Sequence, residues 1–156
     1  QHHGTSNTEV LSEDDNPTLW KYLADFGWIG ESLPKVIIRA SFVPNRVRKF
    51  VDTISANYPQ MSASYVASPG YGNVMVAWRF ELGSDLLVAA RSAIQVTRAA
   101  AYELGGSAII ERCPVHLKSE FDIWGDTGGA IEVMRRMKKQ YDPKGILNPG
   151  RFIGGI

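Results

Sequence analysis

The sequence predicts an α+β fold in which a four-stranded antiparallel sheet carries two helices on one face. Strand-like and helix-like runs follow one another in the order strand, helix, strand, strand, helix, strand. The helical runs are apolar on one side, as expected for helices that cover a sheet. The 156 residues suffice for one core without a disulfide, and the chain has a single cysteine. This order is that of the split βαβ, or ferredoxin-like, sandwich, here with a C-terminal helical appendage.

Two segments precede the predicted sheet. Residues 1–15 are polar, and we expect a disordered or tag-derived lead-in. Residues 16–34 form a short helix and a connection, because Asn16 followed by Pro17 is a helix-start pair and Gly27 ends the helix. The apolar stripe of this helix is Leu19, Trp20, Leu23 and Phe26.

Residues 35–114 form the core of the predicted sandwich. The first strand covers residues 35–42 (KVIIRASF), which are rich in β-branched side chains. Asn45 is expected to cap the next helix, which Pro59 ends. The apolar residues of this one-sided helix are Val47, Phe50, Val51, Ile54 and Tyr58.

A hairpin, a long helix and a last strand complete this core. Strands over residues 63–67 and 73–81 are separated by SPGYG, whose Pro and Gly content indicates a hairpin connection. Asp85 opens a long helix (DLLVAARSAIQVTRAAAYEL) that ends at Gly105. The fourth strand covers residues 107–112.

The period of two along a strand assigns its side chains to two faces. In the first strand, Ile38, Ala40 and Phe42 suit the helix side, and Ile37, Arg39 and Ser41 suit the opposite, open face. By the same alternation, Arg79 and either Glu111 or Arg112 share the open face. Arg39, Arg79 and Arg112 are therefore candidates for contact with a substrate carboxylate or with a partner.

Charge and composition exclude several classes of protein. The net charge of +1 argues against a polybasic nucleic-acid binder, and an RNA-binding sheet would need more central aromatics than VIIRASF offers. No apolar window is long enough for a membrane span. The densest basic stretch lies near the C-terminus and is either a solvated helix face or a contact with a phosphate-bearing ligand or an acidic partner.

The familiar catalytic and metal-binding motifs are missing. The sequence has no GxxxxGK[ST], GxGxxG, GxSxG or HExxH motif. His2 and His3 suit a tag remnant or spacer better than a metal site, and His116 suits a surface or packing residue better than a catalyst. Cys113 is expected to be a small buried hydrophobe at a strand end. We therefore assign no catalytic and no metal-binding residue.

The most specific segment lies in the appendage, residues 115–156, after a helix near residues 129–141. There DPKG is a turn by composition that stops the helix. Asn148 precedes a proline, which favours extended backbone, Gly150 permits a close approach of the chain, and Arg151 offers a planar fork to a carboxylate or phosphate. The alternative is a chain-terminating turn that only packs on the body of the protein.

The run YDPKGILNPGRF at residues 141–152 resembles the C-terminal signature of FAD-linked oxidases of the vanillyl-alcohol oxidase type. Within that superfamily the likeness is greatest to the FAD-binding E subunit of bacterial glycolate oxidase. Further matches are VIIRASFVPNRVRKFVD, ERCP, FDIWG and the terminal FIGGI, so that the likeness spans residues 17–156.

The resemblance implies a function. It implies that this sandwich is the cap, or substrate, domain of an FAD-dependent 2-hydroxy-acid oxidoreductase, in which the flavin takes a hydride from the substrate α-carbon. Asn148, Gly150 and Arg151 would then be cofactor-binding residues. The main flavin-binding domain of the family has no counterpart in these 156 residues, so the chain alone is expected to retain no FAD and to be inactive. The metal-binding HxH pair of related caps is also missing from the predicted fold.

The implied partners are an N-terminal FAD-binding domain, further subunits of a glycolate-oxidase-like complex and a small 2-hydroxy acid. Neither nucleic acid nor a membrane span is expected. The implied location is the cytoplasm, with membrane association only through partner subunits. A different class stays open, namely a stand-alone ferredoxin-like module that binds a ligand or oligomerises through its sheet face.

Overall fold

The structure is a computed structural model of the chain that describes residues 12, 15–27, 36–57, 62–80, 85–126 and 128–156. Its contacts divide the chain into two compact units, Gln1–Leu33 and Pro34–Ile156. This division does not test the predicted boundaries at residues 15, 34 and 114, which stay predictions. In the first unit, the helix α1 (Asp15–Ala24) is present, and Leu19, Trp20 and Leu23 of its predicted stripe are exposed.

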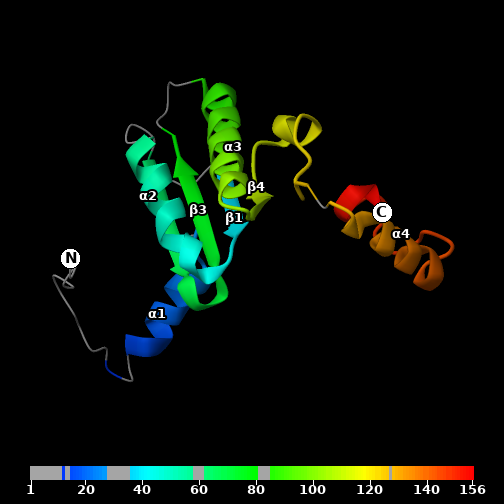
Figure 1. The fold of residues 1–156 in the computed structure, drawn as a ribbon, viewed down its shortest axis with the longest axis horizontal. Coiled ribbons are helices and arrows are strands. Elements are labelled where there is room, and N and C mark those ends of the chain that lie inside the picture. The colour runs from blue at the N-terminus through cyan, green and yellow to red at the C-terminus, as the bar shows by residue number, and fades with distance from the viewer. Residues whose placement is uncertain (1–11, 13–14, 28–35, 58–61, 81–84, 127) are drawn as a thin grey trace. The chain divides into compact units, whose positions relative to one another are not determined.

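The second unit contains the predicted sequence of strands and helices (Figure 1). Its α-helices and strands are β1 (Val36–Ser41), α2 (Val47–Asn57), β2 (Ser62–Ser68), β3 (Asn73–Arg79), α3 (Leu86–Glu103), β4 (Ser107–Arg112) and α4 (Ala130–Tyr141). Its short 3-10 helices are η1 (Pro44–Arg46), η2 (Pro69–Tyr71), η3 (Val115–Ser119) and η4 (Ile153–Gly155).

The four strands form one antiparallel sheet in the order β2-β3-β1-β4. The first and third strands therefore lie side by side at the centre, and each βαβ connection spans one strand, as in the predicted ferredoxin-like sandwich. The prediction of a four-stranded α+β fold is confirmed.

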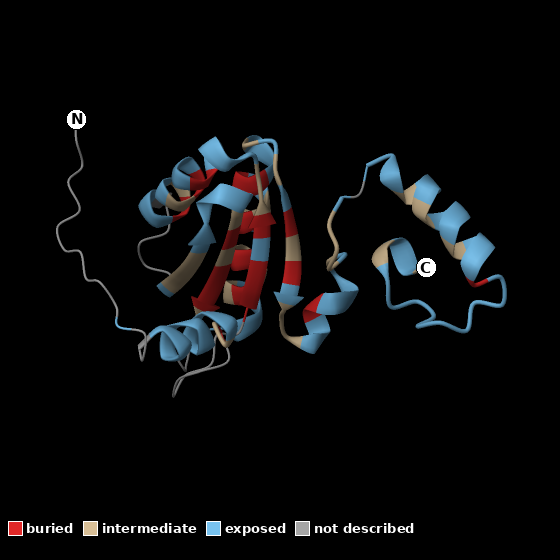
Figure 2. Cartoon of the chain, turned by 90° about the horizontal axis from the view of Figure 1, so that it is seen from below, coloured by how far each residue is buried: buried red, intermediate tan, exposed pale blue. Residues whose placement is uncertain are grey.

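One face of the sheet and the helices α2 and α3 enclose the core. Val36, Ile38 and Ala40 of β1 are fully buried there against Phe50 of α2 and Ile94 of α3. Figure 2 shows the buried residues concentrated on the strands and on the inner sides of these helices. The prediction that Ile38 and Ala40 face the helices is confirmed. Phe42 follows β1 rather than ending it, and its half-buried ring packs against the same core.

A buried hydrogen bond ties the central strand β3 to α3. The indole N–H of Trp78 donates to the Thr97 hydroxyl at 3.0 Å, and this hydroxyl donates to the Ala93 carbonyl at 2.6 Å. Both Trp78 and Thr97 are fully buried. The polar end of the largest core side chain is thus satisfied inside the core.

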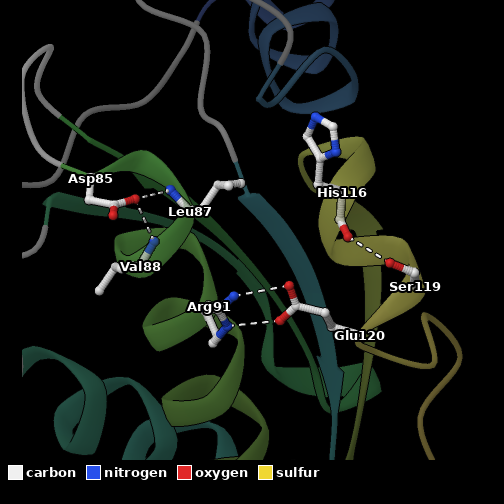
Figure 3. Close-up of polar contacts among 7 residues, drawn as sticks. All are labelled: Asp85, Leu87, Val88, Arg91, His116, Ser119 and Glu120. Atoms are coloured by element: carbon white, nitrogen blue, oxygen red, sulfur yellow. Dashed lines mark hydrogen bonds and ion pairs between the residues drawn. The ribbon is translucent and has the colours of Figure 1, made fainter.

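Of the two predicted helix caps, one is present and one is not. Asn45 does not cap α2, because Pro44 begins a 3-10 turn that contains Asn45 and leads directly into the helix. Asp85 does cap α3, since its carboxylate accepts hydrogen bonds from the Leu87 and Val88 amides (Figure 3). In the hairpin, a Cβ at Gly72 would lie 1.9 Å from the Phe42 carbonyl oxygen, so this position requires glycine.

Some predicted details lie outside the described residues. They are the tag or spacer assignment of His2 and His3, the connection over residues 28–34, Lys35, Tyr58 and the last residue of the predicted strand 73–81. The fourth strand is as predicted, and α3 ends at Glu103, two residues before the predicted Gly105, whose φ is 71°. The appendage helix begins one residue after the predicted start, at Ala130.

We expect Ile38→Asp or Phe50→Asp to unfold the second unit, because both side chains are fully buried in one core. An unpaired carboxylate there costs several kcal/mol, which is comparable to the roughly 5–15 kcal/mol that stabilises a domain. Arg39→Ala is the control, because this side chain is half exposed on the opposite face. Thermal melts followed by circular dichroism compare the three variants. An equal loss of melting temperature for Arg39→Ala would show that the facing assignment is wrong.

Candidate functional site

The open face of the sheet carries all three predicted arginines. Arg39 lies opposite Met75 in the register with β3, and Arg79 lies four residues further along β3. In the register with β4, Ile38 pairs with Ile110 but Ile37 pairs with Arg112. Glu111 is therefore the extra residue of a β-bulge, and the bulge brings both Glu111 and Arg112 to the open face.

Arg39 and Arg79 share this face but lie apart along it. Arg39 and Glu111 form an ion pair. Arg79 instead donates to the Ser64 hydroxyl at 2.6 Å and lies roughly 13 Å from Arg39 along the strand direction. Arg39 thus has a carboxylate partner on the open face, Glu111, whose side of the sheet alternation left undecided.

A segment after β4, residues 120–126, lies along the free edge of that strand, and we call it the edge strap. Its first residue, Glu120, accepts two hydrogen bonds from Arg91 of α3, at 2.8 Å and 2.9 Å (Figure 3). These hydrogen bonds lower the pKa of the Glu120 carboxyl and raise that of the Arg91 guanidinium, because they favour the charged forms. The fork fixes the start of the edge strap against the helix layer.

Three further hydrogen bonds hold the rest of the edge strap. The Ile110 amide donates to the Ile123 carbonyl at 2.8 Å, as it would donate to a carbonyl of a neighbouring strand. The remaining two involve α3, and they join Arg98 Nη2 to the Asp122 carbonyl and the Asp126 amide to the Tyr102 hydroxyl. The edge strap is therefore anchored at both ends and in the middle.

The edge strap carries Trp124, whose ring lies 5.3 Å from that of Phe152 near the C-terminus. Trp124 lines a cavity of about 400 Å³ on the open face, together with Arg39, Glu111 and Ile109. It also lines a second cavity, of about 580 Å³, with Arg151 and Phe152. One aromatic pair thus joins the surroundings of Arg39 to those of Arg151, two predicted site residues far apart in the sequence.

The loop after α4 is built around Asp142. Its two carboxylate oxygens accept hydrogen bonds from the Ile146 and Leu147 amides, both at 3.0 Å, and Lys138 Nζ lies 2.7 Å from Oδ2. Lys138 also donates to the Leu147 carbonyl. The predicted DPKG turn is present, with φ 61° at Gly145 and a hydrogen bond from its amide to the Asp142 carbonyl.

The turn that follows, residues 148–151, differs from the prediction in two respects. Asn148 is not extended but has φ 47°, in the left-handed region. Its carbonyl accepts a hydrogen bond from the Arg151 amide at 3.1 Å, and Gly150 has φ 69°, as a type II turn requires after proline. Gly150 shows no close approach, because a Cβ there would meet no atom within 4 Å, and its positive φ explains the glycine instead.

Asn148 also lines a third cavity, of about 390 Å³, beneath α4. Its walls are apolar, formed by Met134, Met137, Tyr141 and Phe152 with Leu147 and Ile156, while Asn148 and Lys138 are its polar members. Figure 2 shows that α4 has no buried residue. Tyr141, Ile146 and Leu147 are 74%, 71% and 59% exposed. An apolar surface with a few polar groups is typical of a ligand or partner site.

The residues present fit one edge of a flavin site. The side chains of Asn148 and Arg151 are exposed, and neither makes a hydrogen bond or ion pair with another described residue. Their amide and guanidinium groups are donors suited to a carbonyl or phosphate oxygen. The sequence has no glycine-rich motif for binding dinucleotide phosphates, so these residues fit the edge and not the whole of such a site.

Other predicted features have simple structural roles. Cys113 is half-buried beside the core, and burial raises the pKa of its thiol. His116 is exposed on η3, where its carbonyl accepts a hydrogen bond from Ser119 (Figure 3). Within the described ranges, no group of three His, Cys, Asp or Glu side chains could hold a metal ion. No helix in these ranges is long and apolar enough to cross a bilayer.

The comparison with protein families finds a match that covers residues of this site. The family model of FAD linked oxidases, C-terminal domain, matches residues 124–152. The matched segment begins at Trp124 and ends at Phe152, the two members of the ring pair, and contains the 148–151 turn. It supports an FAD-linked oxidase C-terminal domain, and thus an oxidoreductase that holds FAD in its intact form. No curated protein and no solved structure matches the chain.

We expect the loop around Asp142 to resist acid. The pKa of the Asp142 carboxyl is lowered by the hydrogen bond with Lys138 and by those from the Leu147 and Ile146 amides, although desolvation acts in the opposite direction. A group with a lowered pKa stabilises the folded state above the ordinary Asp range and loses this contribution as the pH falls through the lowered value. When the chemical shift of the Asp142 carboxyl carbon is followed by NMR against pH, its titration midpoint should therefore lie below the pKa of an ordinary Asp. A midpoint at or above about 3.9 would contradict this.

Proposed function

We propose that this chain is the C-terminal cap, or substrate, domain of an FAD-dependent oxidoreductase that acts on small 2-hydroxy acids such as glycolate. The observation that carries the proposal is the 148–151 turn, which lies in the segment matched by the FAD linked oxidases. It presents two exposed donors, Asn148 at an apolar cavity and Arg151 at the cavity that Trp124 also lines. The resemblance to the glycolate oxidase E subunit supports the choice of substrate class.

On the flavin side, this chain's role is to bind and orient. FAD, when bound, accepts the hydride from the substrate α-carbon. The Asn148 amide and the Arg151 guanidinium donate hydrogen bonds to a flavin carbonyl or phosphate, and Gly150 supplies the positive φ that the turn needs. The exposed apolar residues near them suit a surface that is covered in the intact protein.

On the substrate side, Arg39 offers its planar fork to the substrate carboxylate. Glu111 occupies part of this fork, and the half exposure of Arg39 leaves other N–H groups accessible. Ile109 and Trp124 form apolar walls of the same cavity of about 400 Å³. Arg79, which lies apart from Arg39 on the same face, and Arg112 then contact the substrate or a partner surface.

The partners follow from the same proposal. They are a flavin-binding domain that faces residues 148–151 and further subunits of a glycolate-oxidase-like complex. The basic residues of the C-terminal segment suit an acidic surface on one of them; they are Arg135, Arg136, Lys138, Lys139, Lys144 and Arg151. We place the protein in the cytoplasm, with any membrane association through partner subunits.

The purified chain of residues 1–156 should be colourless and inactive, because it offers only the edge of a flavin site. Visible absorbance after incubation with FAD and desalting measures this. A stoichiometric flavin spectrum that survives desalting would overturn the assignment of the chain to the cap domain.

In the intact flavin-containing protein, Asn148→Ala or Arg151→Ala should lower turnover or flavin retention by roughly tenfold or more, as expected for a lost hydrogen bond to a charged or strongly polar group. Arg151→Ala should leave the melting of the cap unchanged, because this side chain makes no hydrogen bond or ion pair with another described residue, whereas Asn148→Ala puts alanine at a positive φ and should lower the melting temperature slightly. Lys49→Ala, which removes an exposed cation of α2, is the control. Normal turnover and flavin content, together with a lowered melting temperature, would show that the turn is only structural.

A further inference from the structure

Asn148 has a backbone conformation that needs support from its surroundings. Among the described residues it is the one non-glycine residue with a positive φ, at 47°. The left-handed conformation costs a side-chain-bearing residue free energy, and the proline that follows restricts the preceding residue further. Such a conformation persists only where neighbouring interactions determine it.

The carboxylate of Asp142 supplies these interactions on the N-terminal side. It accepts hydrogen bonds from the successive amides of Ile146 and Leu147, the residues just before Asn148. Asp142 is 7% exposed and is the one buried residue in the fully described range 128–156. Lys138 clamps the same place, because its ammonium group contacts both the Asp142 carboxylate and the Leu147 carbonyl.

This carboxylate is not needed to end the helix. The backbone already closes the end of α4 and the turn after it, since the Asp142 amide donates to the Lys138 carbonyl and the Gly145 amide donates to the Asp142 carbonyl. The side chain reaches beyond that turn, to the two residues that lead into Asn148.

We propose that Asp142, together with Lys138, is the positioning residue of the 148–151 turn. By fixing the Ile146 and Leu147 amides, it holds Asn148 in the left-handed conformation, and the hydrogen bond from the Arg151 amide to the Asn148 carbonyl then sets the direction of Arg151. That this turn faces a flavin rests on the proposed function. The effect of Asp142 on the turn does not.

Amide hydrogen exchange measured by NMR on the chain of residues 1–156 tests this step. Asp142→Asn keeps one carbonyl oxygen but loses the ion pair and the second acceptor, so exchange at Ile146 or Leu147 should become roughly tenfold faster. Exchange at Arg151 should also become faster, although Asp142 does not touch it. Glu132→Gln is the matched control, because it removes a carboxylate of the same helix that pairs with Arg135. Unchanged exchange at Arg151 would overturn the proposal.

A second substitution separates positioning from general loop stability. Glycine adopts positive φ without strain, so Asn148→Gly added to Asp142→Asn should restore slow exchange at Arg151 while Ile146 or Leu147 stays fast. Failure of this rescue would also overturn the proposal. If circular dichroism shows that Asp142→Asn melts α4, Lys138→Met replaces it. This variant must then speed exchange at Leu147 and Arg151, and no change there counts against the proposal.

The same variants distinguish this inference from the proposed function. In the intact flavin-containing protein, Asp142→Asn should shift the visible flavin spectrum, and the added Asn148→Gly should reverse only the part of the shift due to Arg151. If exchange at Arg151 responds as expected in the chain of residues 1–156 and the flavin spectrum does not change, the positioning role of Asp142 stands and the proposed flavin contact is wrong.

Discussion

The structure depends on the pairing of β1 with two antiparallel neighbours. Because β3 and β4 use both hydrogen-bonding edges of this strand, its side chains divide strictly between two surfaces. Ile38 and Ala40 enter the core with α2 and α3, and Arg39 lies between them in sequence but on the opposite side of the sheet. A slip of one residue would bury the guanidinium. The same alternation that builds the core therefore supplies the charged face.

A second constraint on the structure is the free edge of β4. A free strand edge exposes unpaired amides and carbonyls, and the edge strap covers part of it through the Ile123 carbonyl. The fork between Arg91 and Glu120 connects this cover to the helix layer (Figure 3). Trp124 therefore lies on an irregular segment that hydrogen bonds to β4 and α3 hold in place.

The sequence predicted the sheet, its helices and the face of Arg39, because these follow from apolar periodicity and burial. It did not predict features that depend on the backbone conformation of one or two residues. Alternation left open whether Glu111 or Arg112 shares the open face, and the bulge at Glu111 brings both there. Asn45 suits a cap, yet Pro44 starts the turn earlier. Asn148 was expected to be extended before proline, but it has a positive φ and follows the two amides that donate to Asp142, six residues before it. The composition of DPKG predicted a turn there but not these side-chain hydrogen bonds.

The exposure of α4 has a thermodynamic consequence. The helix has 12 residues and buries none of them, and isolated helices of this length are marginal in water. Its exposed apolar side chains lose their contact with water only when the proposed partner covers them, so assembly buries apolar surface on a helix that is already formed. Such a reaction carries a large negative heat-capacity change and pays an entropy cost at the moment of assembly. In the proposed complex, substitutions that change the helix propensity of α4 would then change the affinity even at positions that do not touch the partner.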